Sequence, residues 1–575
     1  MLAVLVSGIT LVPADAPRDW IGPDEIAPGM RAVVRTVLQG TRQEELQVEL
    51  LGVLDDGIGP GTPMILGRFV DEKGRWTGVA AGMSGSPVYV GDRLLGALSY
   101  AIGAFAREPI CGITPIGAMA ALEHLPAGGP PRTGRLTPTP LVLVGRGFGK
   151  GALEEVERLL AERGFAVRIA SGSAMQGATA APAMAPGDPV AALLVWGDVV
   201  LGATGTITWR RDDTLLAFGH PFLGSGRIAL PMASAEIIWT VPSNFNSFKI
   251  ARIGKPVGII EQDRLTAIRG RLGPVPEGIP LNVTIVRRDG APVERRMYLA
   301  RDELLTPVLG AVSSANAVSR EVGAERDEAL SLRLVAHLAG GRDVTTEIAA
   351  AGPGDVQKKF VGEINTFLGR LTAAPVELPP IRGIDVRVTR ADRAGGFEIV
   401  RATPDRLVAR PGEPLAVHVD LEGPRGLRRR SSLRLRIPER ARPGRYVLLV
   451  GSARAVEGKF GNLDEAVRRT AANAEEYLAA MERRPSDATL EARLALPAEG
   501  IVARGRKFPA LPATAHLLMR SRPGGGKRMY RSRYVEVARA RQSLERPVDK
   551  VVAVAVRVAG SAGRRPESGD QEAEE

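Results

Sequence analysis

The residues best suited to chemistry lie in a glycine- and serine-rich segment, residues 78–87, which reads GVAAGMSGSP. Small neighbours on both sides of Ser84 let the backbone turn sharply and leave the serine hydroxyl unhindered. The amides of Gly82 and Ser84 can then converge on one point. Acyl transfer needs this combination of a nucleophile and two donors for the oxyanion. A plain glycine-rich β-turn is an equally good interpretation of the segment taken alone.

A serine hydroxyl is a poor nucleophile without a base, and the chain has five histidines. His220 lies in residues 215–224, LLAFGHPFLG, where an apolar run ends in a Gly-His-Pro corner that would aim the imidazole away from a sheet edge. The other four histidines have contexts typical of structural or surface residues; they are His124, His337, His418 and His516. The sequence therefore favours Ser84 with His220 as its base, although Gly-His-Pro also makes an ordinary turn.

These segments are similar to those of the SpoIVB-type sporulation serine peptidases. Residues 82–87, followed by a strand, a turn and residues 94–100 (LLGALSY), resemble the serine end of that family. Residues 202–209 (GATGTITW) through 217–220 (AFGH) look like its histidine-bearing block. The resemblance implies a serine endopeptidase that cleaves a protein or peptide substrate, holds the oxyanion on the Gly82 and Ser84 amides, and needs no metal or other cofactor.

The order of the two blocks is reversed relative to that family, where the histidine block comes first, as in chymotrypsin-like enzymes. Catalytic geometry depends on how two β modules dock and not on their order along the chain. The resemblance therefore implies a permuted trypsin-like double β-barrel, with residues 126–189 bridging the two modules.

The third member of a triad is open. The family places an aspartate about fifteen residues before the serine, and that offset falls on Phe69 here. Asp71 is the nearest acidic residue, and Asp198 is the rival; either would orient the imidazole and stabilise its charged form. A Ser-His dyad without an acid is the third alternative. The peptide-binding PDZ-type module of the family has no convincing counterpart in this chain.

The elements that must position these residues are expected to be mainly β-strands. The 575 residues include 67 glycines and 43 prolines, a proportion that favours turns and short strands over long helices. Residues 46–54 alternate as a half-buried strand should, and residues 87–90 and 94–98 flank a tight turn at Gly91, which predicts a hairpin. Helical spacing predicts helices near residues 115–125 and 151–163.

Length and composition shifts divide the chain into eight expected segments. They are an N-terminal segment that resembles a degenerate signal peptide (1–25), a serine-bearing β-barrel half (26–125), a linker with a small αβ insertion (126–189), a histidine-bearing β-barrel half (190–300), a mixed α/β region (301–380), a β-sandwich (381–456), a helix plus β accessory region (457–559) and a disordered acidic tail (560–575).

Composition also restricts partners and location. The single cysteine, Cys111, excludes an intramolecular disulfide and multi-cysteine metal sites. The net charge of +12 comes without a nucleic-acid-binding motif, so no nucleic acid partner is expected. The basic run 425–436 is interpreted as a solvated strand face, with peripheral contact to an anionic envelope surface as the alternative. Apolar residues 2–12, followed by an Ala-Asp-Ala sequence, favour export to an extracytoplasmic location.

Two other functions stay open beside the peptidase. One is a non-catalytic cell-envelope binding or scaffold protein that retains the peptidase-like fold, which the reversed order and the uncertain acid favour. The other is an acyl hydrolase that uses Ser84 and His220 on esters. A fluorophosphonate probe distinguishes an active serine from a scaffold, and ester against peptide turnover separates the two hydrolases.

Overall fold

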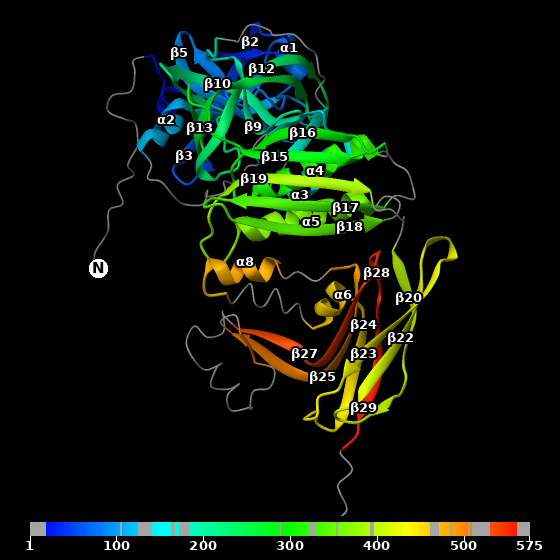
Figure 1. The fold of residues 1–575 in the computed structure, drawn as a ribbon. Coiled ribbons are helices and arrows are strands. Elements are labelled where there is room, and N and C mark those ends of the chain that lie inside the picture. The colour runs from blue at the N-terminus through cyan, green and yellow to red at the C-terminus, as the bar shows by residue number, and fades with distance from the viewer. Residues whose placement is uncertain are drawn as a thin grey trace, which may run out of the picture. The chain divides into compact units, whose positions relative to one another are not determined.

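The computed structural model shows a mainly β protein (Figure 1). The residues that it describes are 19–103, 106–124, 141–162, 167–171, 183–287, 289–322, 329–351, 355–390, 396–460, 471–482, 486–503, 506–508 and 529–560. The chain forms two compact units. Unit 1 consists of Met1–Val283, Glu294–Arg320 and Ile364–Thr372, and unit 2 of Thr284–Val293, Glu321–Glu363 and Ala373–Glu575.

A closed six-stranded barrel with the order β1-β2-β3-β6-β5-β4 begins unit 1, drawn in blue in Figure 1. Its strands are β1 (Arg31–Val37), β2 (Gln43–Gly59), β3 (Thr62–Phe69), β4 (Ser86–Val90), β5 (Arg93–Ile102) and β6 (Ile110–Pro115). Three short helical elements accompany it, η1 (Pro23–Glu25), α1 (Glu72–Thr77) and α2 (Ile116–Ala120), the last followed by η2 (Ala121–His124). The predicted hairpin is β4 and β5, with Gly91 at a φ of 60° in the turn.

Alternating apolar residues close this barrel around one core. The apolar side chains that point inward are almost fully buried, among them Val34, Leu46, Leu50, Ile65 and Val88. Each such side chain contributes roughly 1.5–3 kcal/mol when it leaves water. The sole cysteine, Cys111, belongs to the same core, and burial raises the pKa of its thiol to about 12.

Six further strands of unit 1 form a second ring. They are β9 (Pro189–Gly197), β10 (Val200–Arg211), β11 (Thr214–Ala217), β12 (Gly226–Val241), β13 (Phe248–Asp263) and β14 (Ile268–Leu272). Each pairs antiparallel with its neighbour in the order β9-β12-β13-β14-β11-β10, and β10 pairs back onto β9. The pairings therefore return to their starting strand.

Additional elements extend this ring. Strand β7 (Leu141–Arg146) pairs with β10, and β8 (Val167–Ser171) pairs in parallel with β7 across α3 (Lys150–Ala161), as the sequence predicts for a small αβ piece. On the other side, β16 (Pro292–Leu299) pairs with β9. The remaining elements of this part of the chain are β15 (Ile279–Val286), α4 (Leu305–Val322) and α5 (Asp355–Thr372).

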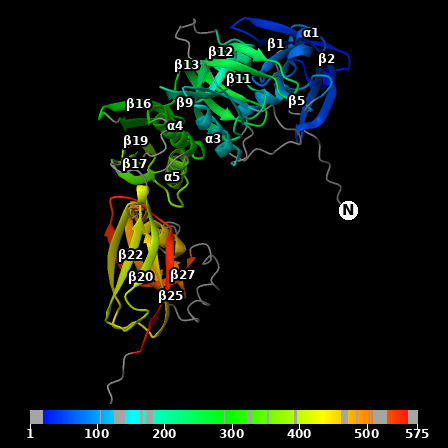
Figure 2. The ribbon, with the colours of Figure 1, turned by 90° about the vertical axis from the view of Figure 1, so that its right-hand side faces the viewer.

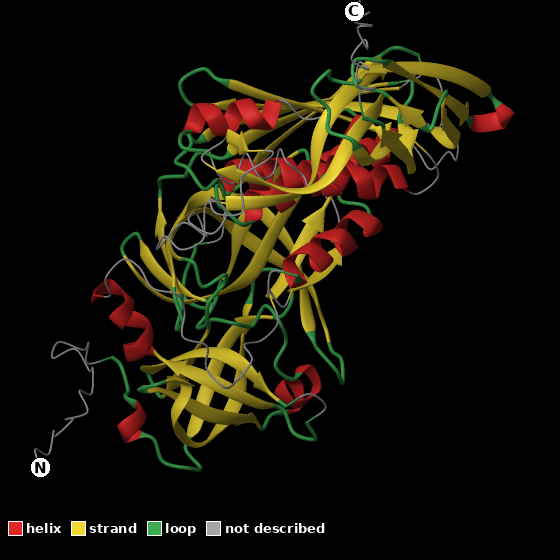
Figure 3. Cartoon of the chain, turned by 90° about the horizontal axis from the view of Figure 1, so that it is seen from below, coloured by secondary structure: helices red, strands yellow, loops and turns green. Residues whose placement is uncertain are grey.

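Unit 2 contains three paired strands of a larger sheet and a β-sandwich. In the sheet, β17 (Ala329–Leu338) pairs antiparallel with β18 (Asp343–Ala351) and β19 (Ile381–Arg390). The sandwich has one sheet in the order β23-β22-β20-β28 and another in the order β21-β29-β24-β25-β26, with β27 on β25. Figure 2 labels β20 and β22 of the first sheet and β25 and β27 of the second, and Figure 3 shows the strands of the chain in yellow. Apolar residues from both sheets form one core.

The sandwich is built from β20 (Phe397–Pro404), β21 (Val408–Ala409), β22 (Pro414–Glu422), β23 (Arg428–Arg436), β24 (Gly444–Ser452), β25 (Thr489–Ala503), β26 (Arg506–Phe508), β27 (Met529–Ser543), β28 (Val548–Asp549) and β29 (Val551–Val558), with the helical elements η3 (Pro424–Gly426), α6 (Ala453–Lys459) and α8 (Ala474–Glu482). The expected limits of residues 381 and 456 are therefore corrected. Strand β19 pairs outside the sandwich, and the second sheet takes most of its strands from beyond β24, because alternation identifies a strand but not its partner.

Several sequence predictions lie outside the described residues. These are the N-terminal segment up to residue 18, residues 126–140 of the expected linker and insertion, and the tail beyond residue 560. None of the helices that the structure describes is long and apolar enough to cross a membrane.

Candidate serine-histidine site

Ser84 lies between α1 and β4 in two consecutive β-turns, residues 80–83 and 83–86. Each turn is closed by a hydrogen bond from its last amide to its first carbonyl, at 2.9 Å and 2.8 Å. The third residue of each turn, Gly82 or Gly85, has a φ of 96°, which a type II turn requires and which glycine adopts without strain. Ser84 thus occupies the second position of the second turn.

Gly85 is also required because the backbone of the histidine-bearing block lies against it. A Cβ atom at this position would lie 2.0 Å from the carbonyl oxygen of Thr206 and 2.5 Å from the amide of Phe218. On the barrel side, the Gly85 amide donates to the carbonyl of Leu98 at 2.8 Å. The serine-bearing loop is therefore enclosed between β5 and the β10–β11 pair.

Hydrogen bonds from β10 hold the same loop. The Thr206 amide donates to the carbonyl of Ser84 at 2.8 Å, and the Thr206 hydroxyl donates to the carbonyl of Gly82 at 3.1 Å. The Thr208 hydroxyl donates to the carbonyl of Gly85 at 2.7 Å. The structure therefore brings residues 82–85 into contact with β10, so the segment that contains Ser84 lies against the segment that leads to His220.

The amides of the loop alternate between used and unused donors. Those of Met83, Gly85 and Ser86 each donate to a carbonyl. Those of Gly82 and Ser84 donate no hydrogen bond within the described part of the chain. An oxyanion hole needs donors that are not already engaged in the unliganded protein. Gly82 and Ser84 meet this requirement.

His220 follows β11 and is 1% exposed. Its Nδ1 atom lies 2.8 Å from the carbonyl oxygen of Pro221. Because a carbonyl only accepts, Nδ1 carries the proton and Nε2 keeps its lone pair. Burial lowers the pKa of the imidazole to about 4, so the ring is neutral at pH 7. Nε2 is buried and has no hydrogen-bond partner among the described residues, which leaves it available as a base.

The residue before His220 is held tightly by the first barrel. The Thr114 hydroxyl donates to the carbonyl of Gly219 at 2.6 Å. Gly219 has a φ of 70°, and a Cβ atom there would lie 1.9 Å from the hydroxyl oxygen of Ser99. The ring of Tyr100 lies with its centroid 6.3 Å from that of His220. Glycine is therefore needed at position 219 to bring the imidazole against β5 and β6.

Phe218 relates Ser84 to His220. Its amide lies against Gly85, the residue after Ser84, and its ring centroid lies 6.1 Å from that of His220. No hydrogen bond joins the Ser84 hydroxyl to His220, and Ser84 is only 5% exposed. The two side chains share one neighbourhood, in an unliganded arrangement in which such contacts are often loose.

Neither candidate acid contacts His220. The carboxylate of Asp71 accepts from the Gly74 amide at 3.1 Å as the N-cap of α1, and from the Gln47 amide at 2.9 Å. The carboxylate of Asp198 accepts from the Arg296 amide at 2.9 Å. Both carboxylates therefore accept hydrogen bonds from backbone amides and not from His220. The orienting partner of the imidazole is the Pro221 carbonyl, which sequence spacing did not predict.

Asp263, at the end of β13, is a site residue that sequence reasoning missed. It is fully buried, and its carboxylate accepts from the amides of Phe222 at 2.7 Å and Leu223 at 2.6 Å. Burial raises the pKa of this carboxyl to about 6, and the amide hydrogen bonds oppose that rise. Asp263 thereby clamps the loop directly after His220. An aspartate at a strand end gives no sequence signal for such a role.

Lys249, near the start of β13, was also missed. Its side chain is fully buried. Its ammonium nitrogen lies 2.8 Å from the hydroxyl of Thr36 on β1. Burial lowers the pKa of the amine to about 7. A buried lysine beside the serine-bearing loop is the least expected feature of this site.

Comparisons with known proteins do not identify a family: no family model, no curated protein and no solved structure matches this chain. Among the residues that the structure describes, no group of three or more histidine, cysteine, aspartate or glutamate side chains could hold a metal ion. The chemistry of the site therefore has to be argued from its own geometry.

Proposed function

We propose that this protein is a serine endopeptidase of the SpoIVB type that uses a Ser84–His220 dyad. His220 Nε2 accepts the hydroxyl proton while the Ser84 oxygen attacks the scissile carbonyl, and the Gly82 and Ser84 amides hold the oxyanion. The tetrahedral intermediate then collapses, His220 returns the proton to the leaving amine, and water releases the acyl group by the same steps. The observation that carries this proposal is that the amides of Gly82 and Ser84 donate no hydrogen bond within the described part of the chain.

The geometry of the imidazole supports a dyad over a triad. In a triad the aspartate keeps the proton on Nδ1 and orients the ring. Here the Pro221 carbonyl performs both tasks at 2.8 Å, without a charge. A dyad of this kind lacks a carboxylate to stabilise the imidazolium, so we expect slower turnover than a triad gives.

The proposal includes the finer fold, a permuted trypsin-like double β-barrel. Its support is the closed barrel β1–β6 and the ring of pairings through β9–β14. Ser84 precedes a strand of the first, and His220 follows a strand of the second. An extracytoplasmic location and a protein or peptide substrate belong to the same proposal.

A second candidate function is the non-catalytic envelope scaffold. The burial of both side chains favours it, because a substrate carbonyl must reach Ser84, which is 5% exposed. Under the peptidase proposal, substrate binding therefore displaces part of the surrounding loops. Under the scaffold proposal, the loop and the imidazole only hold two β modules together.

Labelling with a fluorophosphonate probe tests the proposal. We expect labelling at Ser84 in the wild type, none in Ser84→Ala, and a rate at least about 100-fold lower in His220→Ala, because general base catalysis supplies that much. His418→Ala, on an exposed position of β22, is the matched histidine control and should label normally. Folded wild-type protein that never labels would support the scaffold instead.

Substrate preference separates peptidase from ester hydrolase. Relative kcat/KM values for matched ester and anilide substrates with the same acyl group are the measurement. A peptidase cleaves the anilide at a measurable rate that is lost in Ser84→Ala. Turnover restricted to the ester would place the same dyad in an acyl hydrolase.

A further inference from the structure

Lys249 is the only lysine of the described part of the chain that is fully buried. No carboxylate of that part lies within 4.0 Å of its nitrogen, and its hydrogen-bond partner is the Thr36 hydroxyl. Transfer of an uncompensated ammonium group into a protein interior costs several kcal/mol, so burial favours the neutral amine. A pKa of about 7 means that Lys249 gains or loses its proton near neutral pH.

A chain of polar contacts leads from Lys249 to the turn that presents Ser84. The Lys249 nitrogen lies 2.8 Å from the Thr36 hydroxyl, and the Ser86 hydroxyl lies 2.9 Å from the same Thr36 oxygen. The Ser86 hydroxyl donates to the Met83 carbonyl at 2.6 Å. Met83 and Ser86 are the first and last residues of the Ser84 turn. The hydroxyls of Thr36 and Ser86 thus connect the amine to the Met83 carbonyl, which belongs to the peptide bond before Ser84.

Lys249 also touches the other half of the loop. Its amide donates to the Ala81 carbonyl at 2.9 Å. Its aliphatic stem runs directly past Gly82, where an added Cβ atom would lie 3.1 Å from the Lys249 Cβ and 3.2 Å from its Cδ. Gly82 supplies one of the two unengaged amides. The same side chain therefore supports both ends of the proposed oxyanion hole.

We propose that Lys249 is a positioning residue for the oxyanion loop, and that its neutral amine permits acylation of Ser84 whereas its ammonium form impedes it. This inference rests on the proposed function and adds a regulation by pH to it. An ammonium group has three N–H donors, and the structure provides one acceptor. The two remaining donors compete for the hydroxyl and carbonyl oxygens that fix the loop.

No other titratable group explains a response near pH 7 at this position. The groups that face Lys249 are Thr36 on β1, Ala81 and Gly82 in the loop, and Thr240, its pairing partner on β12. None of these side chains titrates. His220 has a pKa of about 4 and Asp263 a pKa of about 6, so each contributes a separate, more acidic step that is present in Lys249→Met as well.

The test compares the wild type with Lys249→Met, which keeps the length of the stem without the amine. Fluorophosphonate labelling of Ser84 is measured from pH 5 to 9. In the wild type we expect the rate to fall about tenfold for each pH unit below 7. In Lys249→Met the rate at pH 6 should lie within about twofold of that at pH 8. Lys255→Met, at an exposed position of the same strand, is the control and should follow the wild type.

Nuclear magnetic resonance of ¹³C-methyl methionine provides a readout that does not need activity. Met83 lies between Gly82 and Ser84, so its methyl resonance, assigned with Met83→Leu, reports the loop. We expect this resonance to shift with a midpoint near pH 7 in the wild type and not in Lys249→Met. The ¹³Cε resonance of Lys249 should titrate with the same midpoint.

The outcomes separate the two proposals. If Ser84 is never labelled but the Met83 resonance shifts with the same midpoint as Lys249, the proposed peptidase function is refuted. The proposed effect of Lys249 on the loop is then supported. A Lys249 resonance that titrates near pH 10 overturns the inference. So does a labelling rate that is flat from pH 6 to 8, or that rises on acidification, in a wild type that labels at Ser84.

Discussion

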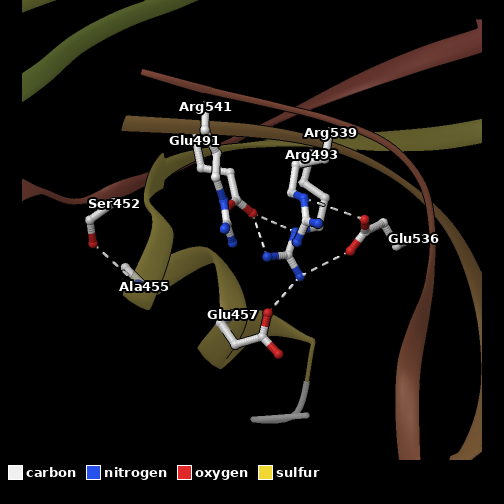
Figure 4. Close-up of polar contacts among 8 residues, drawn as sticks. All are labelled: Ser452, Ala455, Glu457, Glu491, Arg493, Glu536, Arg539 and Arg541. Carbon is white, nitrogen blue, oxygen red and sulfur yellow. Dashed lines mark hydrogen bonds and ion pairs between the residues drawn. The ribbon is translucent and has the colours of Figure 1, made fainter. Parts of the chain in front are cut away.

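Two fully buried cationic side chains, Lys249 in unit 1 and Arg493 in unit 2, lie in opposite surroundings. Lys249 is 0% and Arg493 1% exposed. Lys249 has one hydroxyl as its partner, whereas Arg493 is surrounded by carboxylates (Figure 4). The two residues therefore show that this protein buries a base either with its counter-ions or without any.

Three carboxylates balance the positive charge of Arg493. Its guanidinium contacts Glu457 on α6 at 2.7 Å, Glu491 on the same strand, and Glu536 on β27 at 3.6 Å. It also lies over the ring of Phe460, 4.5 Å from the centroid. An arginine stays protonated in any protein environment, so a buried one requires such acids. This network fastens α6 and β27 to β25.

The lysine is different because it can release its proton. Burial without acids favours the neutral amine, and the charged form becomes more populated as the pH falls. Arg493 therefore behaves as a permanent part of the sandwich, and Lys249 as a group whose state depends on the solution. The predictions below test this contrast.

The largest effect is expected for Arg493→Met. Removal of the guanidinium leaves Glu491, which is fully buried, with the partly exposed Arg541 as its remaining cation. Breaking a buried ion pair from one side typically costs about 3–5 kcal/mol of unfolding free energy. Urea denaturation measures it. Arg539→Ala, which removes a half-exposed neighbour, should cost less than about 1 kcal/mol. Equal stabilities of the two variants would refute an architectural role for Arg493.

Lys249→Met should raise the unfolding free energy, whereas Arg493→Met lowers it. The folded-state pKa of about 7 lies below the unfolded value, so the unfolded chain binds more protons between pH 7 and about 10. Wild-type stability therefore rises with pH across this range. A methionine avoids the cost of burying the amine and should stabilise the protein by about 1–4 kcal/mol at pH 7.

The advantage of Lys249→Met should shrink as the pH approaches 10, because removing the proton from the wild-type lysine costs less free energy as the pH nears the unfolded-state pKa. Urea denaturation at pH 7 and pH 10 gives the difference. Lys255→Met, at an exposed position, should show no such change. A variant that is less stable than the wild type at pH 7 would show that Lys249 is a structural cation like Arg493.

Sequence reasoning located the parts of this site that depend on local backbone geometry. The positive φ angles of Gly82 and Gly85 require glycine, so the turn that presents Ser84 leaves a readable pattern. Lys249 leaves none, because its partner Thr36 is 213 positions away in the chain. The family resemblance implies an acid at a fixed offset before the serine, whereas the observed partner of His220 is a backbone carbonyl, which every residue possesses.

Asp263 provides a third way to bury a charge, with backbone amides in place of counter-ions. In Asp263→Asn one carboxylate oxygen becomes an amide nitrogen, which faces the donors of Phe222 or Leu223. We expect a loss of about 1–3 kcal/mol in unfolding free energy. Fluorophosphonate labelling should slow as well, because the loop after His220 is no longer held. Asp198→Asn, at a turn away from His220, should label at the wild-type rate.

The smallest effect is expected at His337, which is flanked by acids as Arg493 is but is 37% exposed at its side chain. Its ring nitrogens lie 2.7 Å from Asp343 and 3.0 Å from Asp385, and these hydrogen bonds raise the pKa of the imidazole. A raised pKa stabilises the folded state below the unfolded value of about 6.5, and this contribution disappears as the pH rises through the folded value.

His337→Gln should therefore destabilise the protein more at pH 5.5 than at pH 9. Because solvent screens the pair and both aspartates are more than half exposed, the difference should stay below about 1 kcal/mol. His418→Gln, on an exposed position of β22, serves as the control and should show no difference between the two pH values. If His337→Gln instead cost as much as Arg493→Met, burial would not be what gives the Arg493 network its strength, and the contrast with Lys249 would need another explanation.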